Sequence, residues 1–454
     1  MMRNRPHPRA YVETYGCQMN ISDGELMEGL LAEQGYEIVH SPEDADVVLV
    51  NTCAIREHAE TRVLGRVSQL NGLKRDNPDL VIGVTGCMAQ RLGTSLLEQA
   101  PYVDLVMGPD GYRALPESLQ RIRNERSSRG RTQLAVVELQ ATENYQGLEQ
   151  RRAEGPVAWV PIQRGCDHRC TFCIVPYVRG PEKNRDAAEV LAEIEGLAAR
   201  GVSEVTLLGQ TVNSYRSGDV TFPALLRRVA RVPGIRRVRF TSPHPNDVTP
   251  ELVEAMAEES ALCEHLHLPA QSGSDRTLRR MLRRYTVAEL IEKVELVRAA
   301  VPDVAISTDI IVAFPGETDA EFRETLELMR TVRFDEAYTY KYSLRDGTPA
   351  ARLPAEDFLG AEEAQARLAE LIKVSRGVAA EINAREIGRV EEVLIERPGR
   401  DAGQVLGRTR RNKMVVFDGD AARIGEYVRV ELLHTTGATF SGAEVATAAT
   451  AVGA

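Results

Sequence analysis

Cysteine is scarce in this sequence, with 7 among 454 residues, and the number is odd. A secreted domain held together by disulfides would need paired cysteines behind a signal peptide, and nothing ahead of Cys17 resembles one. Long hydrophobic runs are also lacking, since none approaches the ~18 apolar residues of a membrane-spanning helix. We therefore expect a cytoplasmic protein without a membrane partner, in which clustered thiols bind metal or do redox chemistry.

An excess of basic charge is lacking as well. Lys and Arg number 56 against 66 Asp and Glu, which gives a formal net charge of −10. Over the whole chain this charge argues against a nucleic-acid partner, because phosphate binding usually needs a basic surface. The length nevertheless corresponds to about three domains, so a basic patch has to be sought domain by domain.

The first segment, residues 9–125, alternates short apolar runs with amphipathic ones. Strands separated by helices pair in parallel, so an open parallel α/β domain is predicted. Between Arg121 and Arg131 the arginines show no apolar period, and residues 126–152 are interpreted as a basic linker. The predicted strands are 10–15, 46–51, 80–85 and 103–107.

The second segment, residues 153–385, repeats this alternation six times. Six units are too few for the eight of a closed barrel, so a partial (β/α)6 barrel is predicted. The third segment, residues 386–447, holds five β-rich runs between Gly, Asp and Pro turns, which predicts a small all-β barrel. The predicted strands of the second segment are 157–163, 204–209, 237–242, 265–269, 305–314 and 337–343.

Three cysteines lie close together directly after the first strand of the second segment. They are Cys166, Cys170 and Cys173, the barrel cysteines. Ligands of such barrels bind at the C-terminal ends of the strands, so the position suits a catalytic site. Three thiolates can hold three irons of a four-iron cluster and leave the fourth iron open. Zinc with His168 or a distant residue as fourth ligand is the alternative, and the spacing alone leaves both open.

Three further cysteines are scattered in the sequence, but each closely follows a predicted strand of the first segment. They are Cys17, Cys53 and Cys87, the N-terminal cysteines. The C-terminal ends of parallel strands share one edge of a sheet, so these thiols are expected to converge there. Gly16 and Gly86 directly precede two of them, as expected where the backbone turns tightly. A second three-thiolate metal site is therefore predicted.

Several motifs resemble those of a known family over nearly the whole chain. The Cys-x3-Cys-x2-Cys spacing with Phe172 before the last cysteine is similar to the signature of radical S-adenosylmethionine (SAM) enzymes, in which the open iron chelates SAM. Residues 14–20, 51–57 and 86–91 resemble the N-terminal domain of the methylthiotransferases. The third segment is similar to the RNA-binding TRAM module of the same enzymes.

The resemblance implies an enzyme that inserts sulfur and methyl at carbon 2 of isopentenyladenosine, next to the anticodon of tRNA. The sequence Gly-Cys-Gln-Met-Asn at residues 16–20 resembles the subgroup that acts on this base. Methylthiolation of threonylcarbamoyladenosine or of a ribosomal-protein aspartate is the alternative within the family. A non-catalytic, zinc-bearing RNA-binding protein is the alternative from another class.

The resemblance also implies the cofactors, which are SAM and two 4Fe-4S clusters. The cluster on the barrel cysteines reduces SAM, and the cluster on the N-terminal cysteines supplies sulfur. The C2–H bond of adenine is not acidic, so acid–base groups offer little help and the step is delegated to a cofactor. The implied partners of the chain, expected to be a monomer, are the tRNA anticodon loop, a low-potential electron donor and a sulfur source.

By the same resemblance, residues at other predicted strand ends are candidates for SAM binding. Each of them alone is compatible with a simple turn, whereas their common barrel face favours a cofactor site. The candidates are Phe172, Gly209, Gln210, Asn213, Gln271, Ser272, Asp309, Pro315 and Gly316.

Basic side chains gather in the third segment and on one helix face of the second. The anticodon loop is single-stranded, and proteins bind such RNA through splayed bases and phosphate contacts. A solvated strand edge and pairing with acidic neighbours are the alternatives for these side chains. The candidate RNA-binding residues are Arg408, Arg410, Arg411, Lys413, Arg280 and Arg284.

Overall fold

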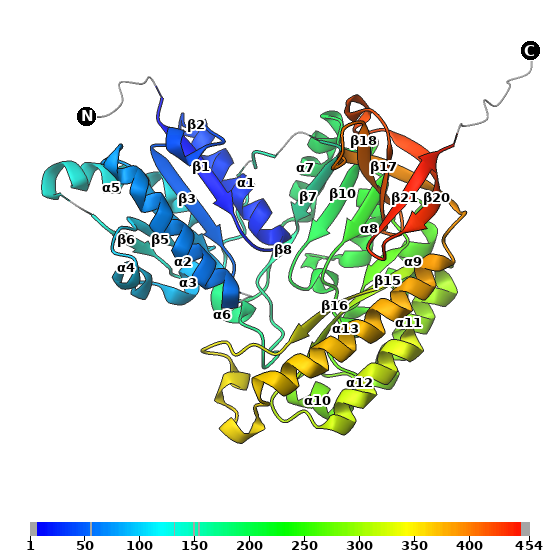
Figure 1. Ribbon diagram of the computed structural model, residues 1–454. Coiled ribbons are helices and arrows are strands. Elements are labelled where there is room, and N and C mark those ends of the chain that lie inside the picture. Colours follow the sequence, from blue (N-terminus) through cyan, green and yellow to red (C-terminus); the bar gives the residue numbers. More distant parts are fainter. Residues whose placement is uncertain (1–6, 55–56, 131, 149, 153–154, 446–454) are drawn as a thin grey trace, which may run out of the picture.

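The structure, a computed structural model, describes residues 7–54, 57–130, 132–148, 150–152 and 155–445 (Figure 1). Its strands form an N-terminal sheet, an open central barrel and a small closed barrel. In Figure 1 the N-terminal sheet lies to the left of the central barrel, and the closed barrel lies at the upper right. Within the described ranges, no helix is long and apolar enough to cross a membrane.

The N-terminal sheet has six parallel strands in the order β2-β1-β3-β4-β5-β6. The predicted strands are present as β1 (Arg9–Thr14), β3 (Val47–Thr52), β4 (Val81–Gly86) and β5 (Leu105–Met107), and β2 (Glu37–Ile38) and β6 (Leu134–Val136) extend the edges. β3 and β4 are buried throughout because helices cover both faces, which suits their runs of branched apolar residues. One face packs on α1 (Gln18–Glu33) and α5 (Leu115–Arg129), the other on α2 (Glu57–Asn71), α3 (Cys87–Leu92) and α4 (Ser95–Gln99).

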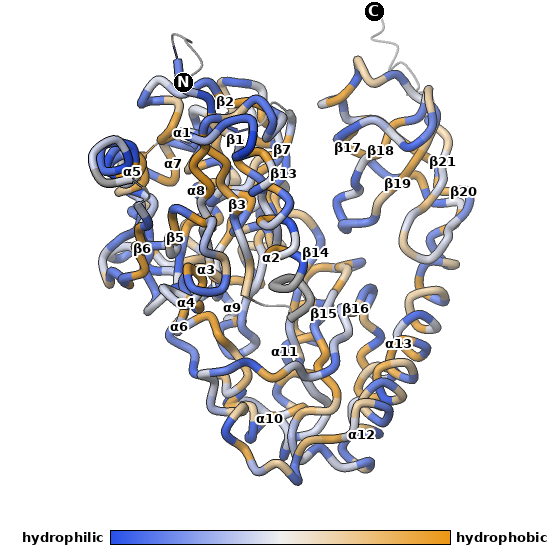
Figure 2. Tube along the Cα trace, turned by 60° about the vertical axis from the view of Figure 1, so that its left-hand side comes forward, coloured by the Kyte–Doolittle hydropathy of each residue, from blue (hydrophilic) through white to orange (hydrophobic). Residues whose placement is uncertain are grey.

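Residues 121–136 differ from the predicted linker. α5 continues to Arg129, and β6 pairs in parallel with β5. Arg126 accounts for the difference, because its guanidinium donates to the buried carboxylate of Asp104 at 2.7 Å and to two backbone carbonyl groups. A polar stretch without an apolar period, largely blue in Figure 2, is thus fixed as a helix by contacts with distant parts of the chain.

The central unit contains all six predicted strands, in two parallel sheets with the orders β13-β10-β7 and β14-β15-β16. A parallel bridge between Val238 and Leu262 links the two sheets, which confirms the partial (β/α)6 barrel. The strands are β7 (Val157–Pro161), β10 (Glu204–Leu208), β13 (Arg237–Phe240), β14 (His265–His267), β15 (Ala305–Val312) and β16 (Glu336–Lys341). The helices packed around them are α7 (Ala187–Ala199), α8 (Phe222–Ala230), α9 (Pro250–Glu258), α11 (Val287–Ala300), α12 (Asp319–Val332) and α13 (Ala361–Ala384).

The loops after the central strands carry short elements around one mouth of the barrel. The loop after β7 is the longest described there and holds the barrel cysteines between β8 and α6. These loops follow the C-terminal ends of the strands, where barrels of this kind place their sites. The short elements are β8 (Gln163–Arg164), α6 (Val175–Arg179), β9 (Lys183–Asn184), β11 (Arg216–Ser217), β12 (Val220–Thr221) and α10 (Asp275–Arg280).

Five strands close the small barrel in the order β17-β18-β19-β21-β20, as predicted. Alternating apolar side chains fill its interior, among them Val393, Val415 and Phe440. The strands are β17 (Val390–Pro398), β18 (Gln404–Thr409), β19 (Met414–Asp418), β20 (Tyr427–Thr435) and β21 (Thr439–Glu444).

Two buried arginines of β13 hold the small barrel against the central one. Nη1 of Arg237 donates to the carbonyl oxygen of Arg408 at 2.8 Å. Arg239 donates to the carbonyl oxygens of Thr409 and Arg410 at 2.7 and 2.9 Å. Because Arg237 begins β13, the small barrel covers the N-terminal end of the central strands, away from the cysteine loop.

Candidate active site

The N-terminal cysteines come together at one edge of the N-terminal sheet. β1, β3 and β4 are adjacent and parallel, and each leads directly into one of the three cysteines. Cys17 precedes α1, and its thiol and the Cys53 side chain are hydrogen-bonded. Cys87 begins α3 and is buried. The convergence expected from the strand ends is therefore present in the fold.

Two glycines shape the backbone beside these thiols. Gly16 has φ +129°, and a Cβ there would lie 2.6 Å from the Cβ of Cys53. Gly86 has φ +92°, and a Cβ would lie 2.4 Å from the carbonyl oxygen of Thr52. Both positions therefore need glycine for conformation and for space. The three thiols beside these turns fit an iron–sulfur cluster in their donor chemistry.

The thiols of this site differ in acidity. The hydrogen bond with Cys53 and the guanidinium of Arg179 lower the pKa of Cys17 to about 6. Burial raises the pKa of Cys87, although the same guanidinium acts in the opposite direction. Metals bind the thiolate form, so metal binding at this site releases protons.

The barrel cysteines lie in the loop between β8 and α6. Sγ of Cys166 lies 3.2 Å from Oγ1 of Thr211, and Nη1 of Arg283 donates to Sγ of Cys170 at 3.5 Å. Burial raises the pKa of Cys173 to about 12. The loop thus places three thiols at the mouth of the barrel, two of which have side-chain partners.

The spacing of the sulfur atoms discriminates between the two metals left open by the sequence. A tetrahedral zinc site with Zn–S bonds of about 2.3 Å brings its sulfurs to roughly 4 Å from one another. Among the described residues, neither cysteine triad has its three sulfurs within 4.8 Å of one another. A four-iron cluster, in which each thiolate binds a different iron, holds its sulfurs further apart, so this spacing agrees better with such a cluster than with zinc.

His168, the other candidate for zinc, has a ligand atom within 4.8 Å of ligand atoms of His244 and Asp247. Its Nε2 lies 3.6 Å from Oδ2 of Asp247, and its ring stacks on His244 with 3.9 Å between centroids. Burial lowers the pKa of His244 to about 2, so that ring is neutral. His168 therefore belongs to a His–His–Asp group beside the cysteine loop.

The two cysteine sites meet through α6. This helix directly follows the barrel-cysteine loop and packs on α3 (Figure 1). Ala54 and Cys87 from the N-terminal unit form one buried cluster with Ile174 and Val178. Arg179, at the end of α6, donates from Nε to Sγ of Cys87 at 3.2 Å. Sequence reasoning missed Arg179, because nothing near it in the sequence indicates its partner.

The candidate SAM-binding residues lie around the barrel mouth, with differing local roles. Oε1 of Gln210 is buried without a hydrogen-bond partner among the described residues, which suits a cofactor contact. Asn213 instead binds the backbone of His244 through both atoms of its amide. The other candidates follow or lie on central strands: Gly209 after β10, Gln271 and Ser272 after β14, Asp309 on β15, and Pro315 and Gly316 after β15. Phe172 packs near Phe314.

The four basic residues of the small barrel are paired with acids. Arg408 binds Glu396, Arg410 binds Glu264, Arg411 binds Glu386 and Glu391, and Lys413 binds Asp335. Three of these acids belong to residues outside the barrel strands, so the cluster helps to dock the small barrel. RNA contact by these four residues stays a prediction that the geometry does not favour.

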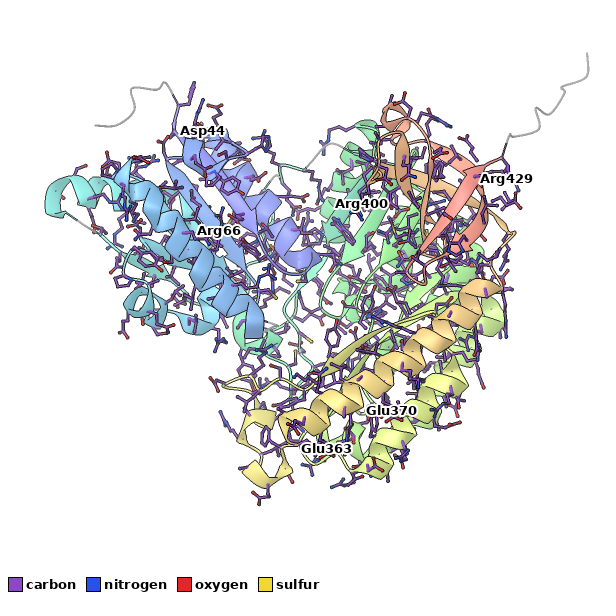
Figure 3. The ribbon with its side chains drawn as sticks, viewed as in Figure 1. Asp44, Arg66, Glu363, Glu370, Arg400 and Arg429 are labelled. Carbon is purple, nitrogen blue, oxygen red and sulfur yellow. The ribbon has the colours of Figure 1, made fainter. Side chains whose placement is uncertain are left out.

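One of the predicted arginines and three that were not predicted are exposed. Arg280 pairs with Asp357 at 2.7 Å, whereas Arg284 is exposed. On the small barrel Arg397, Arg400 and Arg429 are exposed, and Figure 3 labels the last two on its surface. The net charge of the chain does not identify these arginines, because it does not show which arginines lie beside acidic residues in the fold.

Three family models match the chain. Residues 9–108 match the uncharacterized protein family UPF0004, residues 160–329 match the Radical SAM superfamily, and residues 384–442 match the TRAM domain. The three matches fall on the N-terminal sheet, the central barrel and the small barrel.

Curated relatives named tRNA-2-methylthio-N(6)-dimethylallyladenosine synthase are similar over nearly their full length. The relative from Thermoanaerobacter sp. (strain X514) is 44% identical over 439 residues, covering 95% of this chain and 92% of that protein. The relative from Carboxydothermus hydrogenoformans is 43% identical over 434 residues, covering 93% and 96%.

Solved structures share the fold at low identity. The radical SAM methyltransferase TsrM from Kitasatospora setae has a TM-score of 0.57 at 16% identity, over 76% of this chain and 77% of that chain. The cobalamin-dependent radical SAM enzyme OxsB has a TM-score of 0.51 at 13% identity, over 81% and 56%.

Proposed function

Because the chain belongs to the family of the tRNA-2-methylthio-N(6)-dimethylallyladenosine synthases, we propose that it adds a methylthio group to carbon 2 of isopentenyladenosine beside the tRNA anticodon. It is a radical SAM tRNA methylthiotransferase whose cofactors are SAM and two 4Fe-4S clusters. The observation that carries this function is that α6, which directly follows the barrel-cysteine loop, packs against the N-terminal cysteine site at Cys87. A methylthiotransferase needs one site for SAM and another for sulfur, whereas a zinc-binding RNA protein needs neither site.

In this proposal the barrel cysteines bind the cluster that holds SAM, and the N-terminal cysteines bind the second cluster. When bound, these groups supply one-electron chemistry and sulfur, which the acid–base side chains of the chain cannot supply. Thr211 and Arg283 hold the thiols of Cys166 and Cys170 in place. Gln210 presents its unpartnered oxygen to the cofactor.

The protein also keeps water away from the space between the two sites. Ala54, Ile174 and Val178 are buried around Cys87. Exclusion of water limits side reactions of reactive intermediates. The adenine must leave the base stack to reach this space, as in other enzymes that act on a base.

The tRNA is the macromolecular substrate, and the small barrel is the TRAM domain of the enzyme. We propose that the exposed Arg397, Arg400 and Arg429 contact phosphates, with Arg284 near the barrel mouth. The further partners in this proposal are a low-potential electron donor and a sulfur source, and the enzyme acts as a monomer in the cytoplasm. The domains in this proposal are residues 9–125, joined to the next domain by residues 126–152, and residues 153–385 and 386–447.

Mass spectrometry of tRNA nucleosides tests the function directly. Cells that lack a methylthiotransferase for this base accumulate isopentenyladenosine, and expression of this chain is expected to restore its 2-methylthio derivative. C166A is the inactive control, because it removes a ligand of the SAM-binding cluster. Failure of the intact chain to restore the mark, together with a new mark on threonylcarbamoyladenosine, would assign the chain to the other tRNA substrate.

A further inference from the structure

Arg179 carries a contact from one cysteine site to the other. It ends the helix that follows the barrel-cysteine loop, and its side chain is only 4% exposed. Nε donates to Sγ of Cys87 at 3.2 Å, and Nη2 donates to the carboxylate of Asp23 at 2.7 Å and to Oδ1 of Asn20 at 3.3 Å. All three of these acceptors belong to the N-terminal unit.

Asp23 and Arg164 fix the orientation of this guanidinium. The Asp23 carboxylate is fully buried and also accepts from Nη1 of Arg164 at 2.6 Å. Arg164 in turn lies over the Tyr145 ring, 4.6 Å from its centroid. Because Asp23 is shared between two arginines, it compensates the charge of the Arg179 guanidinium beside Cys87 only in part. Nη1 of Arg179 is buried without a partner among the described residues, so this donor is available to a group bound at the site.

We propose that Arg179 is a positioning residue that raises the reduction potential of the iron–sulfur cluster held by the N-terminal cysteines. This role rests on the proposed function, which assigns a cluster to that site. Reduction adds a negative charge to a cluster, and both an N–H donor to a thiolate ligand and a buried positive charge stabilise the reduced form. Arg179 supplies both effects from α6, the helix that directly follows the loop with the ligands of the other cluster.

Arg283 provides a matched comparison at the barrel cysteines. It is buried, and its Nη1 lies 3.5 Å from Sγ of Cys170. Its other hydrogen bonds go to the hydroxyl of Tyr285 and the carbonyl oxygen of Pro269, within the central barrel. Removal of Arg283 is therefore expected to act on the SAM-binding cluster and to leave the N-terminal one unchanged.

The test is a redox titration of the N-terminal cluster followed by electron paramagnetic resonance. The full-length C166A/C170A/C173A variant serves as the parent, because it keeps ligands for the N-terminal cluster alone. R179Q, R179K and R283Q are each added to this parent, and iron content and thermal melting show that the variants are loaded and folded. We expect R179Q to shift the midpoint potential to a more negative value. R179K, which keeps the charge but lacks Nε, is expected to shift it less, and R283Q is expected to leave it unchanged.

An unchanged midpoint in R179Q and R179K at full iron content would overturn the proposal. An equal shift in R283Q would also overturn it, since the effect would then not depend on the contact with Cys87. If R179Q does not fold, the intermediate shift of R179K decides, because lysine retains the cation. A folded parent without iron would instead overturn the proposed function at this site, and that outcome is visible before any arginine is changed.

Discussion

Arg164, close before the first barrel cysteine, donates to the fully buried carboxylate of Asp23 at 2.6 Å. The two residues are 141 positions apart in the sequence. Asp23 lies on α1, directly after the stretch that contains Cys17, so one ion pair joins the segments that carry the two cysteine sites. The relative position of the two sites therefore depends on a buried charge rather than on apolar packing alone.

The first prediction concerns the stability that this carboxylate provides. Asp23→Asn leaves two buried guanidinium groups without their anion, and loss of one partner of a buried pair costs about 3–5 kcal/mol. We expect a lower free energy of unfolding by that amount in chemical denaturation. Asp44→Asn is the control, because Asp44 is exposed and contacts Arg9 at 3.9 Å (Figure 3). Its loss is expected to cost less than about 1 kcal/mol. Equal effects of the two changes would contradict the role of burial.

The second prediction concerns the docking of the small barrel. Arg239→Gln removes two hydrogen bonds to the small barrel. It also removes the hydrogen bond that Nε of Arg239 donates to Glu204 at 2.8 Å in the unchanged protein. We expect a loss of about 3 kcal/mol or more, because bonds to charged groups contribute about 1.5–3 kcal/mol each. Limited proteolysis should then cut between α13 and β17 faster than in the unchanged protein. A matched cleavage rate would show that other contacts hold the small barrel.

The third prediction concerns pH. Burial raises the pKa of Glu25 to about 7, with Glu28 and Glu193 acting in the same direction and Arg152 against it. The unfolded value is about 4.3, so the folded state binds the proton more tightly, and stability falls as the pH rises from about 4 through 7. The melting temperature is expected to fall less between pH 5 and 8 in Glu25→Gln than in the unchanged protein. Glu33→Gln, on the exposed face of the same helix, should leave the slope as it was. Parallel curves for all three proteins would refute the assignment.

The fourth prediction concerns the RNA-binding surface. Arg400 and Arg429 are exposed on the small barrel (Figure 3), and their replacement by alanine is expected to weaken tRNA binding. Loss of two phosphate contacts should reduce the slope of log K against log salt by roughly 1.4. Glu370→Gln on α13 is the control and should not weaken binding. An unchanged salt slope in the arginine double variant would place the RNA elsewhere.

Strand ends were predictable from the sequence because apolar runs and cysteine positions are local signals. β1, β3 and β4 appear where the pattern predicts them, and their order in the sheet brings Cys17, Cys53 and Cys87 to one edge. The resemblance to radical SAM methylthiotransferases is confirmed by relatives that match most of the chain. What the sequence supplied was therefore the fold class and the family.

Charge pairing was not predictable, because its partners lie far apart in the chain. Arg410 looked like part of a basic patch, but its partner Glu264 is 146 residues away. Arg126 likewise pairs with Asp104 across the fold, and this contact holds an expected linker as a helix. Arg179 could not be linked to Cys87 from the sequence for the same reason.

The measurement closest to the central claim compares two triple-cysteine variants in the same reaction with SAM, a reductant and an anticodon stem-loop that contains isopentenyladenosine. Loss of the N-terminal cysteines (C17A/C53A/C87A) should preserve the reductive cleavage of SAM and abolish the methylthio product. Loss of the barrel cysteines (C166A/C170A/C173A) should abolish both. Liquid chromatography with mass spectrometry reads both products in one sample. Methylthiolated RNA from the first variant would contradict two cysteine sites with separate tasks.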